Sequence, residues 1–270
     1  MTTYTSRPVV LCLSGHDPSG GAGLQADIEA LQAQGCHAAP TATALTVQDT
    51  ANVVSFRVLD RDWVLAQART VIADLYAAGC RNIQFDDCTW GIYCDTDFVA
   101  KTGMSPVDLQ KVSELGVALN NAAIEGKPDD LVINTHVCRG NYHCTYAFEG
   151  SYDPIAPYLF AHENVDAFYL EFDTPRAGGF EPLAHVAAGK KVVLGLVTSK
   201  QPGLEDEELL VRRIYEAAQY VPLEDLCLSP QCGFASCECG NKLCVSDACS
   251  FIATLSERAF LASARGAYSR

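Results

Sequence analysis

Four residues at three places along the chain carry side chains that could hold a transition-metal ion. His136 and Cys138 lie in VINTHVCRGN, Glu171 lies in DAFYLEFD, and Cys232 lies in LCLSPQCGFAS. Two thiolates, one imidazole and one carboxylate are ligand types that zinc prefers, and they are four in number. Each sits at the end of a short apolar run that is typical of a buried strand. Because parallel strands end on one face of an α/β fold, we predict that the four side chains converge on one zinc ion.

This ligand set favours a zinc ion that activates a thiol over a structural zinc ion that only stabilises a loop. A thiol is mostly protonated at neutral pH, and binding to zinc keeps it as a nucleophilic thiolate. The alternative is a structural zinc knuckle, because six of the thirteen cysteines lie within residues 227–249. These six contain no CxxC pair, which argues against a knuckle.

A second group of candidates could bind a small substrate. Asp86 and Asp87 end the run RNIQFDD, where a carboxylate can hold the ammonium group of an amino acid by charge-assisted hydrogen bonds. Trp90 follows closely and could stack on a flat ring, although aromatic side chains are commonly core residues. Lys200, at the end of KKVVLGLVTSK, could bind a carboxylate. The alternative for the aspartates is a solvated strand end.

The elements that must position these residues alternate in a way that predicts an α/β fold with parallel strands. Apolar runs predict strands over residues 8–14, 39–48, 53–58, 81–87, 131–137, 166–172, 190–199 and 224–230. Helical periodicity with caps predicts helices over 24–35, 60–75, 106–126, 152–165, 205–221 and 246–263. Asp60 or Asp62 is the expected N-cap of the second helix.

Residues 76–260 resemble cobalamin-independent methionine synthase, in its C-terminal zinc barrel and its shorter, methionine-synthase-II-like branch. The resemblance rests on IQFDD, THVCRGN, YLEFD, LGLVTSK and LSPQCGFAS, in family order. It implies zinc held by His136, Cys138, Glu171 and Cys232, and Asp86 near the ammonium group of the substrate. It further implies methyl transfer from a folate-type donor to a thiol such as homocysteine, forming methionine.

Residues 1–75 resemble the N-terminus of hydroxymethylpyrimidine (phosphate) kinase, a ribokinase-like enzyme of thiamine synthesis. SGHDPSGGAGLQADIEAL and TALTVQDT carry this second resemblance. It implies a pyrimidine pocket that uses Gly15, Asp27 and Gln48. The ATP-binding half of the kinase and its glycine-rich anion hole have no counterpart after residue 75, so phosphorylation is not expected.

The two resemblances meet near Leu75–Tyr76, so the chain looks like a fusion. We therefore expect a ribokinase-like βαβ fragment over 1–75 and a methionine-synthase-like zinc-binding barrel half over 76–270. The expected fold class is α/β, a partial (β/α)₈ barrel preceded by that fragment. Two alternatives to the methyltransferase remain: a pyrimidine kinase, and a non-catalytic zinc-binding fusion.

Composition excludes several classes of partner. The 270 residues carry a formal net charge of −14, which argues against nucleic acid and anionic membranes, because both need basic patches. No apolar run reaches the roughly 20 residues of a membrane helix. The N-terminus lacks the pattern of a signal peptide, and the odd number of cysteines at irregular spacing is typical of reduced thiols, so a cytoplasmic location is expected.

Overall fold

The computed structural model describes residues 9–20, 23–33, 35–49, 52–141, 144–201, 203 and 205–233. The chain forms two compact units. The first contains the described residues up to Arg81 together with Ala122–Leu131, and the second contains Asn82–Asn121 and the described residues from Val132 onward. The helix predicted over 246–263 lies outside the described residues.

The first unit is a small α/β sheet with a βαβ beginning. Its elements are β1 (Val9–His16), α1 (Gly23–Ala33), β2 (His37–Gln48), β3 (Val53–Val58) and α2 (Arg61–Ala77). Strand β1 pairs with β2 in parallel, and β2 pairs with β3 antiparallel. The expected βαβ fragment is confirmed in this arrangement.

Local sequence explains where the two helices of this unit begin. Gly23 has a φ of +64°, and a Cβ there would lie 2.1 Å from the carbonyl oxygen of Gly15. Only glycine therefore lets α1 begin so close to the end of β1. The Asp60 carboxylate accepts from the backbone N–H groups of Asp62 and Trp63, as predicted for the N-cap of α2.

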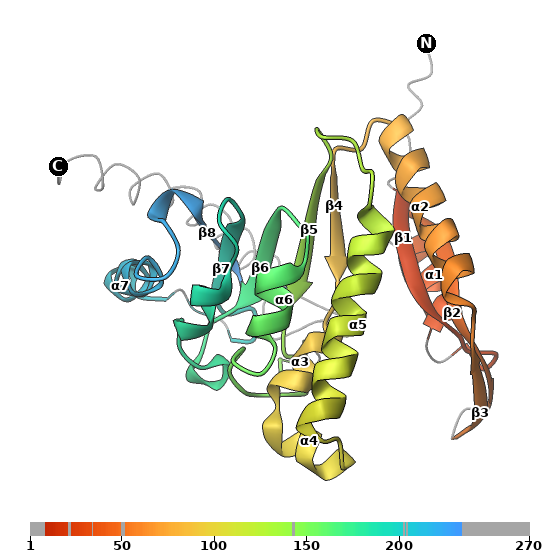
Figure 1. Ribbon diagram of the computed structural model, residues 1–270, viewed down its shortest axis with the longest axis horizontal. Coiled ribbons are helices and arrows are strands. Elements are labelled where there is room, and N and C mark those ends of the chain that lie inside the picture. The colour runs from red at the N-terminus through yellow and green to blue at the C-terminus, as the bar shows by residue number, and fades with distance from the viewer. Residues whose placement is uncertain are drawn as a thin grey trace. The chain divides into compact units, whose positions relative to one another are not determined.

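The second unit is built on five parallel strands. Their order across the sheet follows the chain (Figure 1), namely β4 (Asn82–Asp86), β5 (Val132–Val137), β6 (Ala167–Glu171), β7 (Lys191–Val197) and β8 (Leu226–Pro230). A closed barrel of this type has eight strands, whereas within the described residues this sheet ends at β4 and β8. The α/β fold class with a partial barrel is therefore confirmed.

Helices connect these strands and set where each strand ends. They are α3 (Thr89–Cys94), α4 (Thr96–Thr102), α5 (Pro106–Ile124), α6 (Ala156–His162) and α7 (Glu207–Ala217), with short 3₁₀ turns at Pro175–Ala177, Glu181–His185 and Leu223–Asp225. Asp95 caps α4 and Asp206 caps α7 through backbone N–H groups three residues later. Gly103, with a φ of +76°, ends α4 in the left-handed conformation.

The core of the second unit lies around the central strands, whose side chains are buried along most of their length. Tyr152 is fully buried and packs on Phe160 and Phe172. Its hydroxyl donates to the carbonyl oxygen of Val137 at 2.9 Å and accepts from the backbone N–H of Glu171 at 2.9 Å. Tyr152 thus links the ends of β5 and β6 through its hydroxyl group.

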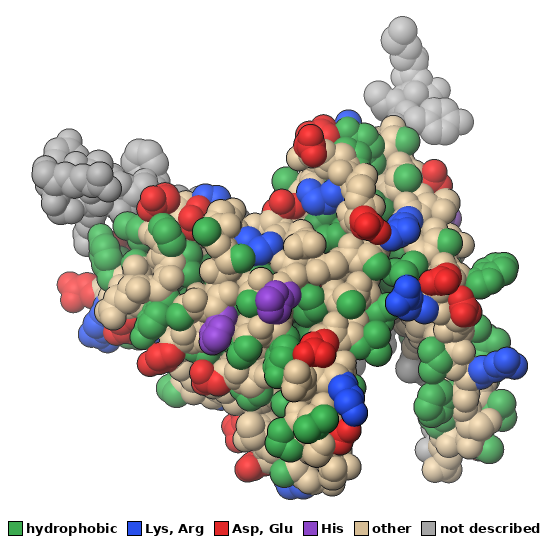
Figure 2. Space-filling model, in the orientation of Figure 1, with side chains coloured by type: hydrophobic (Ala, Val, Ile, Leu, Met, Phe, Trp, Pro, Cys, Tyr) green, Lys and Arg blue, Asp and Glu red, His purple; other side chains and the backbone are tan. Residues whose placement is uncertain are grey.

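The surface shows mixed charge. On the face seen in Figure 2, acidic and basic side chains are interspersed, without a continuous basic patch. None of the helices in the described part of the chain has the length and apolar character needed to cross a membrane.

Candidate metal centre

The ends of β4 and β5 bring three metal-ligand side chains together. Asp86, the last residue of β4, pairs in register with His136 of β5. Cys88 follows shortly after β4, and Cys138 follows β5 directly. The Sγ atoms of Cys88 and Cys138 lie 3.2 Å apart, and the ligand atoms of Cys88, His136 and Cys138 all lie within 4.8 Å of one another.

Cys232, in the loop after β8, contacts one member of this group. Its thiol interacts with the Cys138 thiol, and it is half-buried. The side-chain amide of Asn141 donates to the carbonyl oxygen of Gly233 at 2.5 Å. Because this bond ties the loop after β5 to the turn after β8, it holds Cys232 close to Cys138.

Contacts within the cluster shift the pKa values of its cysteines in opposite directions. Hydrogen bonds from Cys232 and Cys88 lower the pKa of Cys138, against the opposing effect of burial, and His136 adds to the lowering. The same contacts with Cys138, together with burial, raise the pKa of Cys88 and of Cys232. Burial lowers the pKa of His136, but the Cys138 contact and nearby carboxylates outweigh it, and the net direction is upward.

This donor set fits a zinc ion. The Nε2 atom of His136 is buried and has no hydrogen-bond partner among the described residues. Its distance to the Oδ1 atom of Asp86 is 4.0 Å, which is too long for a hydrogen bond. Buried polar atoms are normally satisfied, and an imidazole nitrogen facing several thiols is a donor arrangement that zinc satisfies.

Glu171 is the last residue of β6, at the same edge of the sheet, but its carboxylate accepts hydrogen bonds from other groups. Its Oε1 accepts from the Nε and Nη2 atoms of Arg176 at 2.9 and 2.6 Å. Its Oε2 accepts from the backbone N–H of Arg139 at 3.1 Å and from the Gln231 amide at 3.4 Å. Burial raises the pKa of Glu171, while Arg176 opposes that shift. A ligand role for Glu171 stays a prediction.

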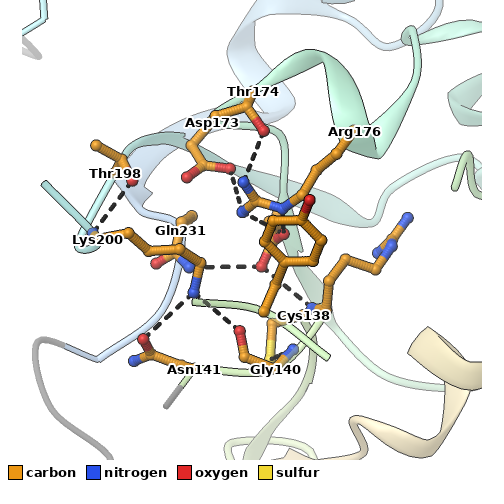
Figure 3. A network of polar contacts seen from close by, with 12 residues as sticks. Cys138, Gly140, Asn141, Asp173, Thr174, Arg176, Thr198, Lys200 and Gln231 are labelled. Atoms are coloured by element: carbon orange, nitrogen blue, oxygen red, sulfur yellow. Dashed lines mark hydrogen bonds and ion pairs between the residues drawn. The ribbon is translucent and has the colours of Figure 1, made fainter. Parts of the chain in front are cut away.

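Lys200 faces the loop after β5. Its Nζ atom donates to the carbonyl oxygens of Gly140 and Thr145 at 2.9 and 3.0 Å, and to Asn141 Oδ1 at 3.3 Å. Figure 3 shows Lys200 reaching Gly140 and Asn141, beside Gln231. Burial lowers the pKa of Lys200. In this arrangement Lys200 holds the loop that carries Cys138, and its role toward a substrate carboxylate stays a prediction.

The two candidate aspartates lie in different environments. The side chain of Asp86 is 71% exposed, so it can reach a ligand from solvent. Asp87 instead accepts from the Trp90 indole N–H and from the Asn120 amide, both at 2.9 Å. Trp90 is only 2% exposed and packs against Gly116. The structure therefore places Trp90 in the core, where its ring is not open to solvent for stacking.

The Asn120 amide also donates to Oε1 of Glu163 at 2.6 Å, which links Asp87 to a fully buried carboxyl group. Burial raises the pKa of Glu163 from its usual 4.5 to about 7. Because the folded-state pKa is raised, this group stabilises the fold fully at low pH, and the contribution is lost as pH rises from 4.5 through 7. We expect the second unit to lose up to about 3 kcal/mol over that range.

Urea unfolding followed by Trp90 fluorescence at several pH values measures this effect. Glu163→Gln is expected to flatten the pH dependence, because the amide cannot ionise. Glu208→Gln, an exposed position on α7, is the matched control and should keep the wild-type slope. An unchanged slope in Glu163→Gln would show that the buried carboxyl is not its source.

Several residues of this site were not singled out from the sequence. Cys88 follows the DD pair in FDDC, and that proximity was the available signal. Arg139 lies within the quoted THVCRGN motif. Arg176 and Gln231 had no local signal, since their roles depend on reaching Glu171 from other segments.

The residues implied by the kinase resemblance lie in the first unit. Gly15 is part of β1, Asp27 is part of α1, and Gln48 ends β2. The Asp27 carboxylate accepts from the Ser14 hydroxyl at 2.6 Å. Their roles in binding a pyrimidine stay predictions.

Comparison with known proteins finds both families, and the two matches overlap over residues 50–81. Residues 17–81 match the family described as phosphomethylpyrimidine kinase, and residues 50–242 match the family described as cobalamin-independent synthase, catalytic domain. The kinase of that name from Salmonella typhimurium, hydroxymethylpyrimidine/phosphomethylpyrimidine kinase, is 36% identical over 89 residues, which are 33% of this chain and 30% of the relative.

The larger part has relatives in sequence and in structure. YxjG of Bacillus subtilis, an uncharacterized protein, is 44% identical over 179 residues, which are 65% of this chain and 47% of YxjG. A crystal structure from Listeria monocytogenes, assigned as a vitamin-B12 independent methionine synthase, matches with a TM-score of 0.54 and 32% identity, over 75% of this chain and 54% of that one. The chain thus spans about half the length of these relatives. With most of its length matched and both resemblances found, the chain belongs to the cobalamin-independent synthase catalytic-domain family, joined to a phosphomethylpyrimidine kinase-like N-terminal segment.

Proposed function

We propose that this chain is a zinc-dependent methyltransferase that moves a methyl group from a folate-type donor to the thiol of homocysteine or a related amino acid, forming methionine or its analogue. The observation that carries the proposal is the juxtaposition of the Cys88, His136 and Cys138 ligand atoms with Asp86 at one sheet edge. Family membership supports the class of reaction.

The metal residues of the proposal are His136, Cys138 and Cys232, with Glu171 added by the family resemblance. A bound zinc ion would supply a lowered thiol pKa, so that a substrate thiol is a nucleophile at neutral pH. The neighbouring cysteines support this chemistry, because their hydrogen bonds lower the pKa of Cys138.

Asp86 has the properties of a group that binds an amino acid. Its side chain is exposed and stands beside the metal-ligand cluster, because its Oδ1 atom accepts from the Cys88 thiol at 3.4 Å and lies 4.0 Å from His136 Nε2. An ammonium group donates strong, charge-assisted hydrogen bonds to a carboxylate. We therefore propose that Asp86 orients the substrate by its ammonium group, with its thiol toward the cysteine cluster.

Asp86→Asn tests this role. Hydrogen bonds to charged groups contribute about 1.5–3 kcal/mol, so the Kd for homocysteine, measured by calorimetry on zinc-loaded protein, is expected to rise about 10–100-fold. The zinc content should stay unchanged, because the substitution leaves the His136 and cysteine side chains in place.

The matched control is Asp97→Asn, which changes an exposed aspartate of α4 and should leave homocysteine affinity as in the wild type. Methionine formation from homocysteine and methyl-folate is the direct assay of the reaction. If homocysteine binds Asp86→Asn as tightly as the wild type, the substrate role of Asp86 is wrong. If no methionine is formed from homocysteine and methyl-folate, and calorimetry shows no homocysteine binding, the proposed function itself is wrong.

A second candidate function is favoured by the match of residues 17–81 to phosphomethylpyrimidine kinases. A ligand that binds the folded state raises thermal stability. Hydroxymethylpyrimidine and homocysteine can therefore be compared in one thermal unfolding experiment. Stabilisation by the pyrimidine alone would favour the kinase-like reading, and stabilisation by neither would favour a non-catalytic zinc-binding fusion.

A further inference from the structure

We propose that Gln231 is a positioning residue of the metal centre, which holds two of its predicted ligands, Glu171 and Cys232, in place. Its side-chain amide orients the Glu171 carboxylate, and its backbone fixes the start of the turn that carries Cys232. The inference rests on the zinc centre of the proposed function, to which both of these ligands belong. It adds a residue that acts on the metal only through the ligands that it holds.

Gln231 lies where the ends of β6, β7 and β8 meet. It follows β8 directly and precedes Cys232, and only 1% of its surface is exposed. Its backbone N–H donates to the carbonyl oxygen of Val197, the last residue of β7, at 2.7 Å. This bond fixes the chain at Gln231 relative to β7, immediately before the predicted ligand Cys232.

A glycine on β7 makes room for Gln231 beside Glu171. Gly195 pairs in register with Glu171 across β6 and β7. A Cβ on Gly195 would lie 2.7 Å from the Cα atom of Gln231, which is closer than a side-chain carbon can approach without displacing the backbone. Because glycine has no Cβ, the backbone of Gln231 can lie against this position. The side chain of Gln231 therefore starts next to the Glu171 carboxylate.

The neighbouring groups decide which end of the Gln231 amide faces Glu171. Its Nε2 atom donates to Oε2 of Glu171 at 3.4 Å, and its Oε1 atom accepts from the Ser199 hydroxyl at 2.7 Å. Arg176, which donates to the other oxygen of Glu171, favours the ionised carboxylate. An ionised carboxylate only accepts hydrogen bonds, so the NH₂ group must face it. Figure 3 shows Gln231 and Arg176 in one network of polar contacts.

The donors on Oε2 of Glu171 connect this carboxylate to both predicted cysteine ligands. One donor is the backbone N–H of Arg139, which follows Cys138, and the other is the amide of Gln231, which precedes Cys232. Hydrogen bonds from such outer groups hold a metal-binding carboxylate in the orientation that the ion needs. Gln231 donates through its side chain, so a substitution can remove this hydrogen bond and leave the backbone in place.

Gln231→Leu tests this role, because leucine is of similar size but has no donor. Competition with a chromophoric chelator, on the full chain purified without a histidine tag, measures zinc affinity. We expect the affinity to fall about 10–100-fold, the usual effect of losing an outer partner of a ligand. The visible spectrum of the Co²⁺-loaded chain reports ligand geometry and should also change. Gln110→Leu, which removes an exposed glutamine that donates to Glu114 on α5, should match the wild type in both measurements.

A double-variant cycle separates this role from general packing. If Gln231 acts through Glu171, Gln231→Leu should change zinc affinity by less than about threefold in a Glu171→Gln background. A purely structural role would lower the affinity equally in both backgrounds. Ser199→Ala keeps Gln231 but removes the donor to its amide oxygen, and it should lower zinc affinity about fivefold, as expected for one hydrogen bond.

The outcomes distinguish this inference from the proposed function. Wild-type zinc affinity and an unchanged Co²⁺ spectrum in Gln231→Leu would overturn the role of Gln231 and leave the zinc centre intact, as would an equal loss of affinity in the Glu171→Gln background. If Gln231→Leu does not fold, an unchanged affinity in Ser199→Ala would overturn the role instead. A wild-type chain that binds no zinc would overturn the zinc centre of the proposed function, and the role of Gln231 with it.

Discussion

Replacing Cys138 with serine is expected to abolish zinc binding. Cys138 is the hub of the cluster, because it contacts Cys88, Cys232 and His136. The hydrogen bonds of the two neighbouring thiols lower its pKa, so it is the cysteine best prepared to bind a cation. A serine hydroxyl stays protonated at neutral pH and cannot replace a thiolate ligand. The zinc affinity should fall by more than the 10–100-fold typical of an outer-shell change.

Elemental analysis of the purified chain, followed by competition with a chromophoric zinc chelator, measures this effect. The wild type should carry one zinc per chain, and Cys138→Ser should carry none after dialysis. Circular dichroism of Cys138→Ser should retain the wild-type secondary structure, which separates metal loss from unfolding. Cys227→Ser, on the exposed side of β8, should bind zinc normally. Full zinc occupancy in Cys138→Ser would contradict the proposed centre.

Replacing Arg176 with methionine is expected to destabilise the second unit by about 3–5 kcal/mol, the usual effect of breaking a buried ion pair from one side. The Arg176 guanidinium lies 2.6 Å from Glu171 and 2.8 Å from Asp173, and both carboxylate side chains are fully buried. Without the cation, two buried anions face each other, and burial already raises the pKa of Glu171. Methionine fills most of the volume but provides no charge.

The two tryptophans make this measurement specific to one unit. Trp90, in the second unit, is 2% exposed, whereas Trp63 of α2 is 79% exposed in the folded chain. The change of fluorescence on unfolding in urea therefore reports mainly on the second unit. Arg212→Met, at an exposed position of α7, should change the unfolding free energy by less than about 0.5 kcal/mol.

A double variant separates the ion pair from simple packing. Glu171→Gln combined with Arg176→Met removes one charge from each side, so it should be more stable than the sum of the two single changes implies. A loss of stability in Arg176→Met no larger than that in Arg212→Met would show that Arg176 is not a structural anchor of this edge.

Much of the fold could be read from the sequence because the signals are local. Apolar runs bounded by turn residues mark each strand, and Asp60 at the start of a helical periodicity marks the N-cap of α2. The alternation of strands and helices is enough to predict parallel pairing. The order of five motifs along the chain was likewise enough to recognise the resemblance to the family that the family match confirms.

For the candidate site, the sequence predicts the residue types but not their contacts. The sequence determined which side chains stand at strand ends, including His136 near the end of β5 and Cys138 directly after it. It determined that these residue types are those of a zinc site, because ligand preference is a property of the side chain itself.

Only the tertiary structure decided which of these groups meet. Cys88 approaches Cys138 because Gly91 allows two backbones, 47 residues apart along the chain, to touch, and no local pattern encodes that contact. The Glu171 carboxylate accepts from Arg176, which follows it five residues later along the chain. Trp90 lies in the core, where its indole N–H donates to Asp87. Strand position follows from local periodicity, whereas the partner of each buried side chain follows from packing and charge balance across the whole unit.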